Sequence, residues 1–333
     1  MSEPAAKKQK VEGNQLEQLK AHTIVVADTG DFESIKAFKP TDATTNPSLI
    51  FAAAKMPQYK KLVTEAIAYG KENSPEGASD EDVLALILDK LAVNFGSEIL
   101  KVVEGLVSTE VDARLSYDTA ESVFRAKRII ELYEAAGINR SRILIKLATT
   151  WEGVQAAKEL KKEGINCNMT LLFNFAQAVT CCEAGVTLIS PFVGRIRDWY
   201  QNSTGKTYSA EEDPGCISVK KIYNYYKKYG YDTVVMGASF RSKEEVLELA
   251  GCDKLTIAPK LLEAMEQSDD EVPLKLSAET AKDAEVGPKI TVDEKTFRWM
   301  LNEDAMATEK LAEGIRNFSK DLVKLEEFVK EQM

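Results

Sequence analysis

The 333-residue sequence has little histidine, no C-x-x-C pair of cysteines and no long hydrophobic run. With His22 as the only histidine, a zinc site built on two or three imidazoles is impossible, so we expect no metal centre. No apolar stretch approaches the roughly 20 residues that cross a bilayer, so we expect no membrane role. The cysteines form no C-x-x-C pair and are odd in number, which is typical of reduced intracellular thiols: Cys167, Cys181, Cys182, Cys216 and Cys252.

Basic residues are in the minority, with 43 Lys and Arg against 53 Asp and Glu and a net charge of −10. This charge repels nucleic acid, and an anionic substrate would need a local positive site. Residues 1–15 lack the apolar core of a signal peptide and the arginines of a transit peptide, so we predict a flexible tail and a cytoplasmic location. The basic KKQK at residues 7–10 resembles a weak nuclear-localisation patch, which leaves nuclear access open, although we favour a solvated tail.

Beyond the tail, one pattern recurs: an amphipathic helical run, a glycine, and a short β-rich run. Each glycine stands where a helix ends in the left-handed conformation, and five such positions are clear: Gly137, Gly164, Gly185, Gly230 and Gly251. Three more strand-like runs precede these units at residues 23–28, 43–48 and 105–112, with helical stretches near 49–70 and 81–104. Eight alternating strands and helices imply a parallel sheet.

Polar residues at the strand ends distinguish a closed barrel from an open sheet. In an open sheet these ends would spread over roughly 30 Å, because neighbouring strands lie about 4.8 Å apart. Only closure brings them together, and eight strands enclose an interior just wide enough for side chains, with the active site at their C-terminal ends. We therefore predict a single α/β domain over residues 16–333, a (β/α)8 TIM barrel. The polar residues concerned are Asp28, Asn46, Glu110, Lys146, Asn168, Thr170, Ser190 and Arg241.

Three segments fall outside the eight units. Residues 195–214 are long and polar, so we expect a loop that forms a lid or rim. Residues 266–292 are interpreted as a charged connector. Residues 293–332 have a helical pattern, and we expect this C-terminal helix to pack back across the barrel or near a subunit interface.

The stretch RILIKLATT, residues 142–150, places Lys146 inside a strand that is apolar on both faces. Removing an ammonium group from water costs several kcal/mol unless it is paired or loses its proton. One interpretation is a structural ion pair with Glu110 or Asp28. The other is a Schiff-base lysine, kept partly neutral by nearby arginines and an apolar wall. The residues by themselves leave both interpretations open.

Several segments resemble the motifs of transaldolase. TTNPSL at residues 44–49 and ILIKLATTWEG at residues 143–153 are similar to its two signature segments, and further stretches resemble its remaining active-site strands: VSTEVDARLS, NMTLLF, ISPFVGRI and GASFR. The resemblance runs from about Gln15 to Lys330 with every motif in order. The departures are minor, such as Met169, whose side chain we expect to point away from the site.

This resemblance implies transfer of a dihydroxyacetone unit from sedoheptulose 7-phosphate to glyceraldehyde 3-phosphate, in the pentose phosphate pathway, giving erythrose 4-phosphate and fructose 6-phosphate. It implies that Lys146 forms the imine and that Asp28 takes the proton from the donor's C4 hydroxyl. Glu110 would move protons during imine formation and hydrolysis, through a water held by Thr170. No cofactor is expected, and the resemblance suggests a homodimer that meets through helical surfaces.

The resemblance also indicates a set of substrate-binding residues. Asn46 and Asn168 would hydrogen-bond substrate hydroxyls. Ser190, Arg195 and Arg241 would bind the phosphate, because arginine forks suit phosphate oxygens and supply the local positive charge. Without the resemblance, Asn46 before a proline is equally a turn residue.

Other residues have competing interpretations. Asp28 is also a candidate helix cap or turn residue. Phe192 is either ordinary core or faces the enamine carbon, where a side chain with no proton to give would favour transfer over release. Arg197 is interpreted as a solvated arginine outside the site.

Three other functions are considered at this point. A Schiff-base fructose 6-phosphate aldolase would release its three-carbon product, whereas a transferase would turn over slowly without an aldehyde acceptor. A non-catalytic sugar-phosphate-binding barrel would lack at least one of Lys146, Glu110 and Asp28, and all of these are present. A pyridoxal phosphate enzyme would also use a lysine but would be coloured.

Overall fold

The computed structural model describes residues 12–333. Its eight strands form a closed parallel barrel in sequence order, with β1 also paired to β8. The predicted TIM barrel is therefore confirmed. The strands are β1 (Ile24–Asp28), β2 (Asp42–Thr44), β3 (Val107–Glu110), β4 (Ile143–Ala148), β5 (Asn166–Leu172), β6 (Leu188–Pro191), β7 (Val234–Gly237) and β8 (Lys254–Ile257).

Helices surround the barrel, and the five predicted glycine ends all have positive φ values between 68° and 98°. None of the helices within residues 12–333 is both long enough and apolar enough to span a bilayer. The helices are α1 (Gln15–Lys20), α2 (Phe32–Ile35), α3 (Pro47–Ala54), α4 (Lys60–Asn73), α5 (Asp80–Ile99), α6 (Thr119–Ala135), α7 (Trp151–Lys162), α8 (Phe175–Glu183), α9 (Val193–Thr204), α10 (Pro214–Lys228), α11 (Lys243–Leu247), α12 (Pro259–Glu266), α13 (Glu294–Glu303) and α14 (Ala305–Gln332). Short 3-10 turns occur at Pro57–Tyr59, Ala113–Leu115, Arg140–Arg142 and Thr280–Asp283.

Alternation along the strands decides which side chains enter the barrel. A small apolar layer fills the interior, and it contains Val26, Leu144, Leu188 and Met236. Because strand residues i and i+2 share a face, Asp28, Lys146 and Ser190 project into the same interior, one layer nearer the C-terminal ends. The intervening residues, such as Ile145 and Met169, belong to the main core outside the sheet. The expectation that Met169 points away from the site is thus confirmed.

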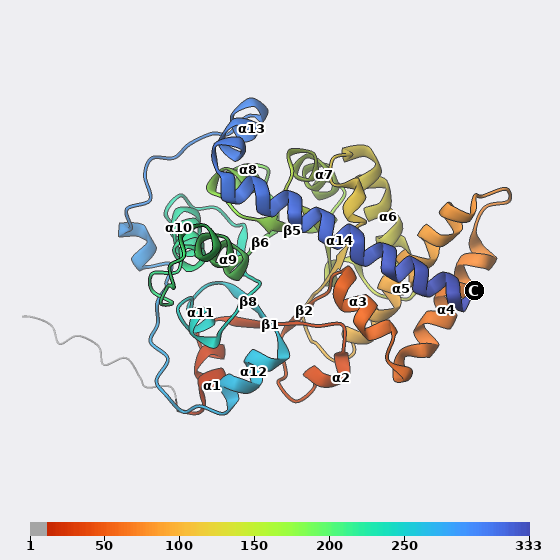
Figure 1. Cartoon of the computed structure of the whole chain (residues 1–333), viewed down its shortest axis with the longest axis horizontal. Helices are drawn as coiled ribbons and strands as arrows, with labels where there is room; N and C mark the ends of the chain where they lie inside the picture. Colours follow the sequence, from red (N-terminus) through yellow and green to blue (C-terminus); the bar gives the residue numbers. More distant parts are fainter. Residues whose placement is uncertain (1–11) are drawn as a thin grey trace, which may run out of the picture.

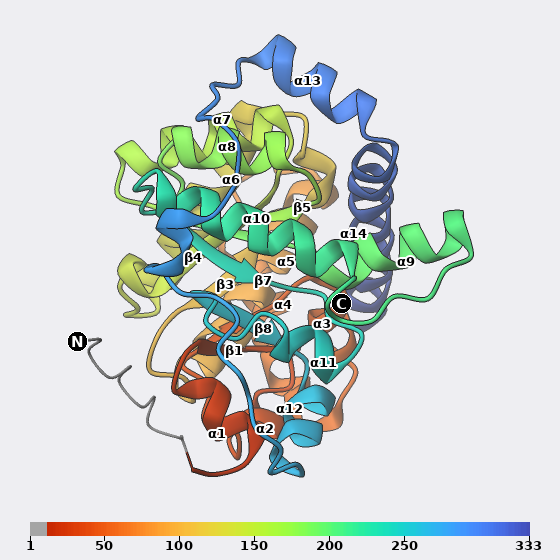
Figure 2. The ribbon, with the colours of Figure 1, turned by 90° about the vertical axis from the view of Figure 1, so that its left-hand side faces the viewer.

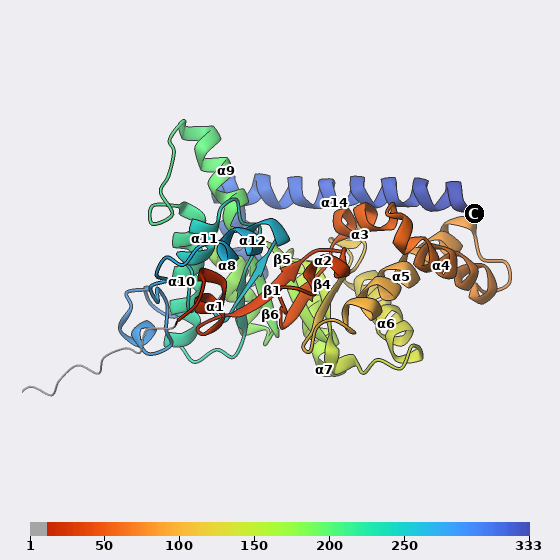
Figure 3. The ribbon, with the colours of Figure 1, turned by 90° about the horizontal axis from the view of Figure 1, so that it is seen from below.

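The C-terminal helix α14 crosses the barrel, as predicted from the helical pattern of residues 293–332. It runs in front of the strands in Figure 1 and lies along one side of the molecule in Figure 3. It packs against α3 and α9, while α13 leads into it from the end of the molecule seen at the top of Figure 2. Ser48 on α3 donates a hydrogen bond to Asp321 on α14, which ties this helix to the rim.

Two segment predictions were wrong. Residues 195–204 belong to helix α9 and only residues 205–213 form a loop, because a helix that buries a narrow face has a largely polar sequence. The strand predicted at 43–48 ends at Thr44, since Asn46 caps α3 and Pro47 occupies its first turn.

Helix α1 begins at Gln15, whose backbone N–H donates to Ser268 O at 2.7 Å. The KKQK patch and most of the predicted tail lie outside the described residues.

Candidate active site

A cavity of about 240 Å³ lies at the C-terminal ends of the strands. This is the end of a (β/α)8 barrel at which such proteins carry their active sites. Most of the residues predicted from sequence meet there, although they come from segments far apart in the chain. The lining consists of Asp28, Thr44, Asn46, Lys146, Ser190, Phe192, Arg195, Ala238, Ser239, Phe240, Arg241, Thr256, Ala258 and Phe318.

Lys146 is 4% exposed and its amine faces this cavity from β4. Nζ donates to Thr45 O at 3.1 Å and lies 3.2 Å from Glu110 Oε2. The ring of Phe318 lies 5.8 Å from Nζ. The ion pair considered from the sequence is therefore present, and the lysine is also open to a ligand, so the two interpretations are compatible.

Glu110 ends β3 directly beside Lys146, its register partner on β4. Burial raises the pKa of Glu110, and this effect outweighs the opposing field of Lys146. Two buried oxygens here, Glu110 Oε2 and Thr170 Oγ1, have no hydrogen-bond partner within residues 12–333. Thr170 is the β5 partner of Ala148, two residues beyond the lysine. Both oxygens therefore have spare hydrogen-bonding capacity close to the amine.

Asp28 lies at the end of β1 and accepts a hydrogen bond from Thr44 Oγ1 at 2.8 Å. The Thr44 hydroxyl is in turn 2.6 Å from the hydroxyl of Thr256. Burial raises the pKa of Asp28, while Lys146 opposes that rise. The helix-cap alternative for Asp28 was wrong, since α2 begins after Asp31.

The two predicted asparagines occupy different depths. Asn46 lines the cavity and also caps α3, where its Oδ1 accepts from Leu49 N at 3.0 Å. Asn46 thus acts as a helix cap rather than within a turn, and its amide N–H groups have no hydrogen-bond partner within residues 12–333. Asn168 is fully buried, donates to Ser108 Oγ at 3.0 Å and accepts from Ser190 Oγ at 2.6 Å. Asn168 does not line the cavity, and it meets the lining through Ser190.

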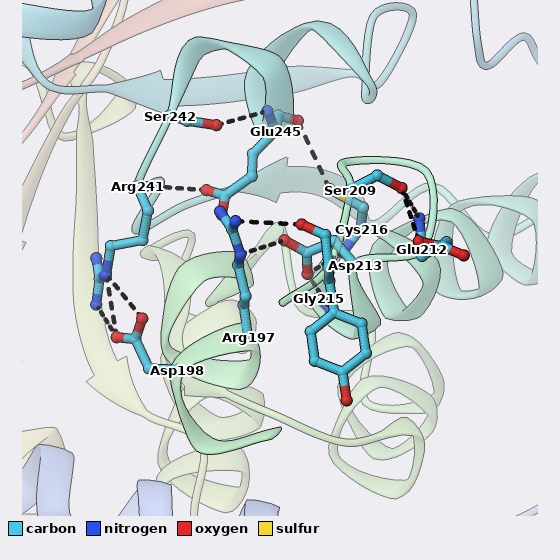
Figure 4. Close-up of polar contacts among 11 residues, drawn as sticks. Arg197, Asp198, Ser209, Glu212, Asp213, Gly215, Cys216, Arg241, Ser242 and Glu245 are labelled. Carbon is cyan, nitrogen blue, oxygen red and sulfur yellow. Dashed lines mark hydrogen bonds and ion pairs between the residues drawn. The ribbon is translucent and has the colours of Figure 1, made fainter. Parts of the chain in front are cut away.

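Two arginines stand at the rim in different electrostatic settings. The guanidinium of Arg195 lies between two aromatic rings, 4.9 Å from Phe192 and 5.5 Å from Phe318. Burial, and then the charge of Arg241, lower the pKa of Arg195. Arg241 is instead held by Asp198, with Nη2–Oδ2 at 2.7 Å (Figure 4). The predicted positive site is present, and Arg195 supplies its charge without an ion-pair partner within residues 12–333.

Several lining residues were missed from sequence. Ser239 has φ = +63° and lies 3.5 Å from Arg241 Nη1, and its place two residues before that arginine in GASFR was an available signal. Phe318 had none, because it comes from α14 and reaches the cavity only by tertiary packing. Arg197 was wrongly interpreted as solvated: its side chain is 19% exposed and bonds Glu245 at 2.7 Å.

Residues 12–333 contain no cluster of metal-binding side chains and no disulfide bond. No group of three or more His, Cys, Asp or Glu side chains in this part of the chain could hold a metal ion. All the cysteines predicted to be reduced thiols are free and buried. The ionisable groups that line the cavity are Asp28, Lys146, Arg195 and Arg241.

Comparison with known proteins agrees with this geometry. The Transaldolase/Fructose-6-phosphate aldolase family matches residues 25–329. A transaldolase of Saccharomyces cerevisiae is 60% identical over 337 aligned residues, covering 100% of this chain and 99% of that protein. Transaldolases of Homo sapiens and Bos taurus are each 59% identical, covering 100% of this chain and 98% of theirs. With its buried lysine at the C-terminal mouth of the barrel and similarity of this extent, the chain belongs to the transaldolase family.

Proposed function

We propose that this transaldolase moves a dihydroxyacetone unit from sedoheptulose 7-phosphate to glyceraldehyde 3-phosphate, with Lys146 as the Schiff-base nucleophile. The observation that supports this role most directly is a buried amine that faces a cavity, with Glu110 Oε2 3.2 Å away and Asp28 in the cavity lining, and burial raises the pKa of both carboxyls. Groups tuned in this way are suited to proton transfer near neutral pH.

In the first half-reaction, the Lys146 amine attacks C2 of the donor, and the carbinolamine loses water to give a protonated imine. Glu110 donates the proton that leaves with this water, through a bridging water held by Thr170. Asp28 then takes the proton of the C4 hydroxyl, the C3–C4 bond breaks, and its electron pair moves to the imine to form an enamine. Erythrose 4-phosphate leaves as the aldehyde product.

In the second half-reaction, the enamine carbon attacks the aldehyde carbon of glyceraldehyde 3-phosphate. Asp28 returns its proton to the new hydroxyl, and water adds to the imine to release fructose 6-phosphate and regenerate Lys146. Asn46 orients the donor hydroxyls, and Asn168 accepts a hydrogen bond from the hydroxyl of Ser190 and so fixes that side chain. The enamine must persist until the acceptor binds. Because the ring of Phe192 in the cavity lining has no acidic proton to give to the enamine carbon, it favours transfer over hydrolytic release.

Arg195, Arg241 and Ser190 bind the phosphate, joined by Ser239. The sandwiched guanidinium of Arg195 supplies charge, and Arg241, already oriented by Asp198, supplies a fork of N–H donors.

A fructose 6-phosphate aldolase is the second candidate, because the matching family carries both names. Transfer is favoured because the relatives with full-length similarity are transaldolases. We also propose the cytoplasmic location and the homodimer suggested by the resemblance.

The test is to trap the intermediate with borohydride in the presence of fructose 6-phosphate, followed by peptide mass mapping. We expect a three-carbon adduct on the peptide that contains Lys146. An adduct on any other lysine, or none at all, would refute the assignment. An acceptor-dependence assay then separates the two enzymes, since rapid turnover without an aldehyde would identify the aldolase.

A further inference from the structure

Arg197 extends from α9 into a buried polar cluster with Asp213 and Glu245 (Figure 4), and it does not line the cavity. Its Nη1 donates to Glu245 Oε1 at 2.7 Å, and its Nη2 donates to Tyr208 O at 3.3 Å. Its Nε lies 3.7 Å from Asp213 Oδ2. The side chains of Asp213 and Glu245 are fully buried. The cluster thus joins α9, the 205–213 loop and α11.

Glu245 links this cluster to the phosphate-binding loop. While Oε1 accepts from Arg197, Oε2 accepts the backbone N–H of Arg241 at 2.5 Å. Its own backbone N–H donates to Ser242 Oγ at 3.3 Å, and this bond caps α11. One carboxylate therefore connects Arg197 to the main chain of an arginine that lines the cavity.

The side chain of Arg241 is held by a residue of α9. Asp198, the residue after Arg197, accepts from Arg241 Nε at 3.0 Å and from Nη2 at 2.7 Å. At the start of α9, Gly194 donates to Ser239 O at 2.8 Å, and a side chain at Gly194 would collide with Arg241. Asp198 of α9 thus holds the guanidinium of Arg241, while Arg197 of α9 reaches the Arg241 backbone through Glu245.

The charges in the cluster are an unusual way to stabilise a fold. One arginine faces two buried carboxylates, and burial, together with Glu245, raises the pKa of Asp213 to about 6. Arg197 Nε and Asp213 Oδ2 also lack a hydrogen-bond partner within residues 12–333. Well-packed apolar residues often stabilise a protein as well as a buried ion pair does, so the value of this arrangement lies in geometry.

We propose that Arg197 and Glu245 are positioning residues for phosphate recognition: they set the backbone of Arg241 and the orientation of α9, which also carries Arg195. This inference rests on the proposed function, in which these two arginines bind the substrate phosphate. Neither Arg197 nor Glu245 lines the cavity, so they act through the residues that do.

The experiment compares two acceptors, glyceraldehyde 3-phosphate and unphosphorylated glyceraldehyde, at a fixed donor concentration. In Glu245→Gln, we expect the KM for the phosphorylated acceptor to rise about tenfold, because the phosphate contact is misaligned. The kcat/KM for glyceraldehyde should change less than about twofold, since that acceptor has no phosphate. The acceptor ratio is the kcat/KM for glyceraldehyde 3-phosphate divided by the kcat/KM for glyceraldehyde. Arg197→Lys should lower this ratio by about threefold, because lysine keeps the charge of arginine but loses its fork of N–H donors.

Glu248→Gln is the matched control. Glu248 is a similarly buried carboxylate three residues further on, with an ion pair to Lys275 at 2.8 Å, and it contacts neither rim arginine. Its ratio should stay within about twofold of wild type. An equal loss for both acceptors in Glu245→Gln, or an unchanged ratio, would overturn the inference.

Arg241→Lys separates this inference from the proposed function. If its acceptor ratio is unchanged, the phosphate site itself is wrongly assigned. If Arg241→Lys shifts the ratio and Glu245→Gln does not, only the positioning role fails. Circular dichroism checks the fold, and should Glu245→Gln not fold, Arg197→Lys decides the question by the same ratio.

Discussion

Lys146 and Lys254 each lie on a barrel strand and each pairs with a carboxylate on another strand, but at opposite ends of the barrel. Lys254 begins β8 and bonds Asp42, the first residue of β2, whereas Lys146 pairs with Glu110 near the C-terminal ends of β4 and β3. Both pairs are well buried, with side-chain exposures of 12% and 6% at the first and 6% and 5% at the second. Burial therefore does not distinguish them.

The two pairs differ in how completely their hydrogen bonds are satisfied. Asp42 accepts from Lys254 through Oδ2 and from Leu106 N through Oδ1 at 2.8 Å. Glu110 Oε2 has no hydrogen bond within residues 12–333, and the lysine beside it faces the cavity. Removing Lys254 would leave the Asp42 charge buried and unpaired, so we expect this pair to be structural, whereas a lysine beside a cavity has room to react.

The largest effect should come from Lys146→Arg. Arginine keeps the positive charge beside Glu110 but cannot form an imine, so transfer should fall by about 10⁴-fold or more. The measurement is a coupled transfer assay together with borohydride trapping. Lys254→Met should retain the adduct on Lys146. A Lys146→Arg enzyme with more than about 1% of wild-type activity would mean that the pair at the cavity is only structural.

The next effect concerns the carboxylates of the two pairs. Glu110→Gln should slow imine formation about 10³-fold, because the group that moves protons is lost. The rate of adduct formation in single-turnover trapping measures this step. Asp42→Asn keeps an acceptor for Leu106 N and should leave that rate within about threefold of wild type. Equal losses in both variants would remove the functional distinction between the two ends.

The free energy of unfolding should depend more on the Lys254–Asp42 pair, which we expect to matter little for activity. Lys254→Met leaves Asp42 buried without its cation and should lower the free energy of unfolding by about 3 kcal/mol. Urea unfolding measures the change. Adding Asp42→Asn removes the unpaired charge, so the double variant should recover most of the loss. No loss in the single variant would show that the N-terminal pair contributes nothing measurable.

A smaller effect is expected from Phe192→Tyr. The new hydroxyl at the cavity wall offers a proton to the enamine, so the ratio of dihydroxyacetone release to transfer should rise about tenfold with fructose 6-phosphate as donor. Product analysis with and without an aldehyde acceptor measures that ratio. Unchanged partitioning would refute this role for Phe192 and assign the control of release to other groups around Lys146.

The smallest effect concerns stability and pH at the cavity. Because burial raises the pKa of Asp28 above its ordinary 3.8, folding is opposed when this carboxyl is ionised. Asp28→Asn should therefore raise the melting temperature at pH 8, and the gain should vanish below pH 3.8, where the carboxyl is protonated in both states. Asp42→Asn should instead lower the melting temperature at pH 8. A lower melting temperature for Asp28→Asn at pH 8 would contradict the assigned direction.

Much of the fold was predictable because the signals were local. Positive φ at a helix end requires a residue such as Gly137, and alternation within ILIKLA places Lys146 on one face whatever surrounds it. The errors also have local causes. The sequence of α9 resembles a loop because the helix buries few apolar side chains. The predicted strand at 43–48 extends beyond β2 because Asn46 caps α3 instead of continuing the strand.

The sequence by itself determined the eight-unit order, the interior face of each strand and the residue types available for imine chemistry. Only the tertiary structure decided that Phe318 reaches the cavity, that Asn168 meets its lining through Ser190 and that Arg197 is buried with two carboxylates. The physical reason is distance along the chain. Periodicity and capping act over a few residues, whereas the depth of a side chain and its ionic partners depend on elements brought together by barrel closure and by α14.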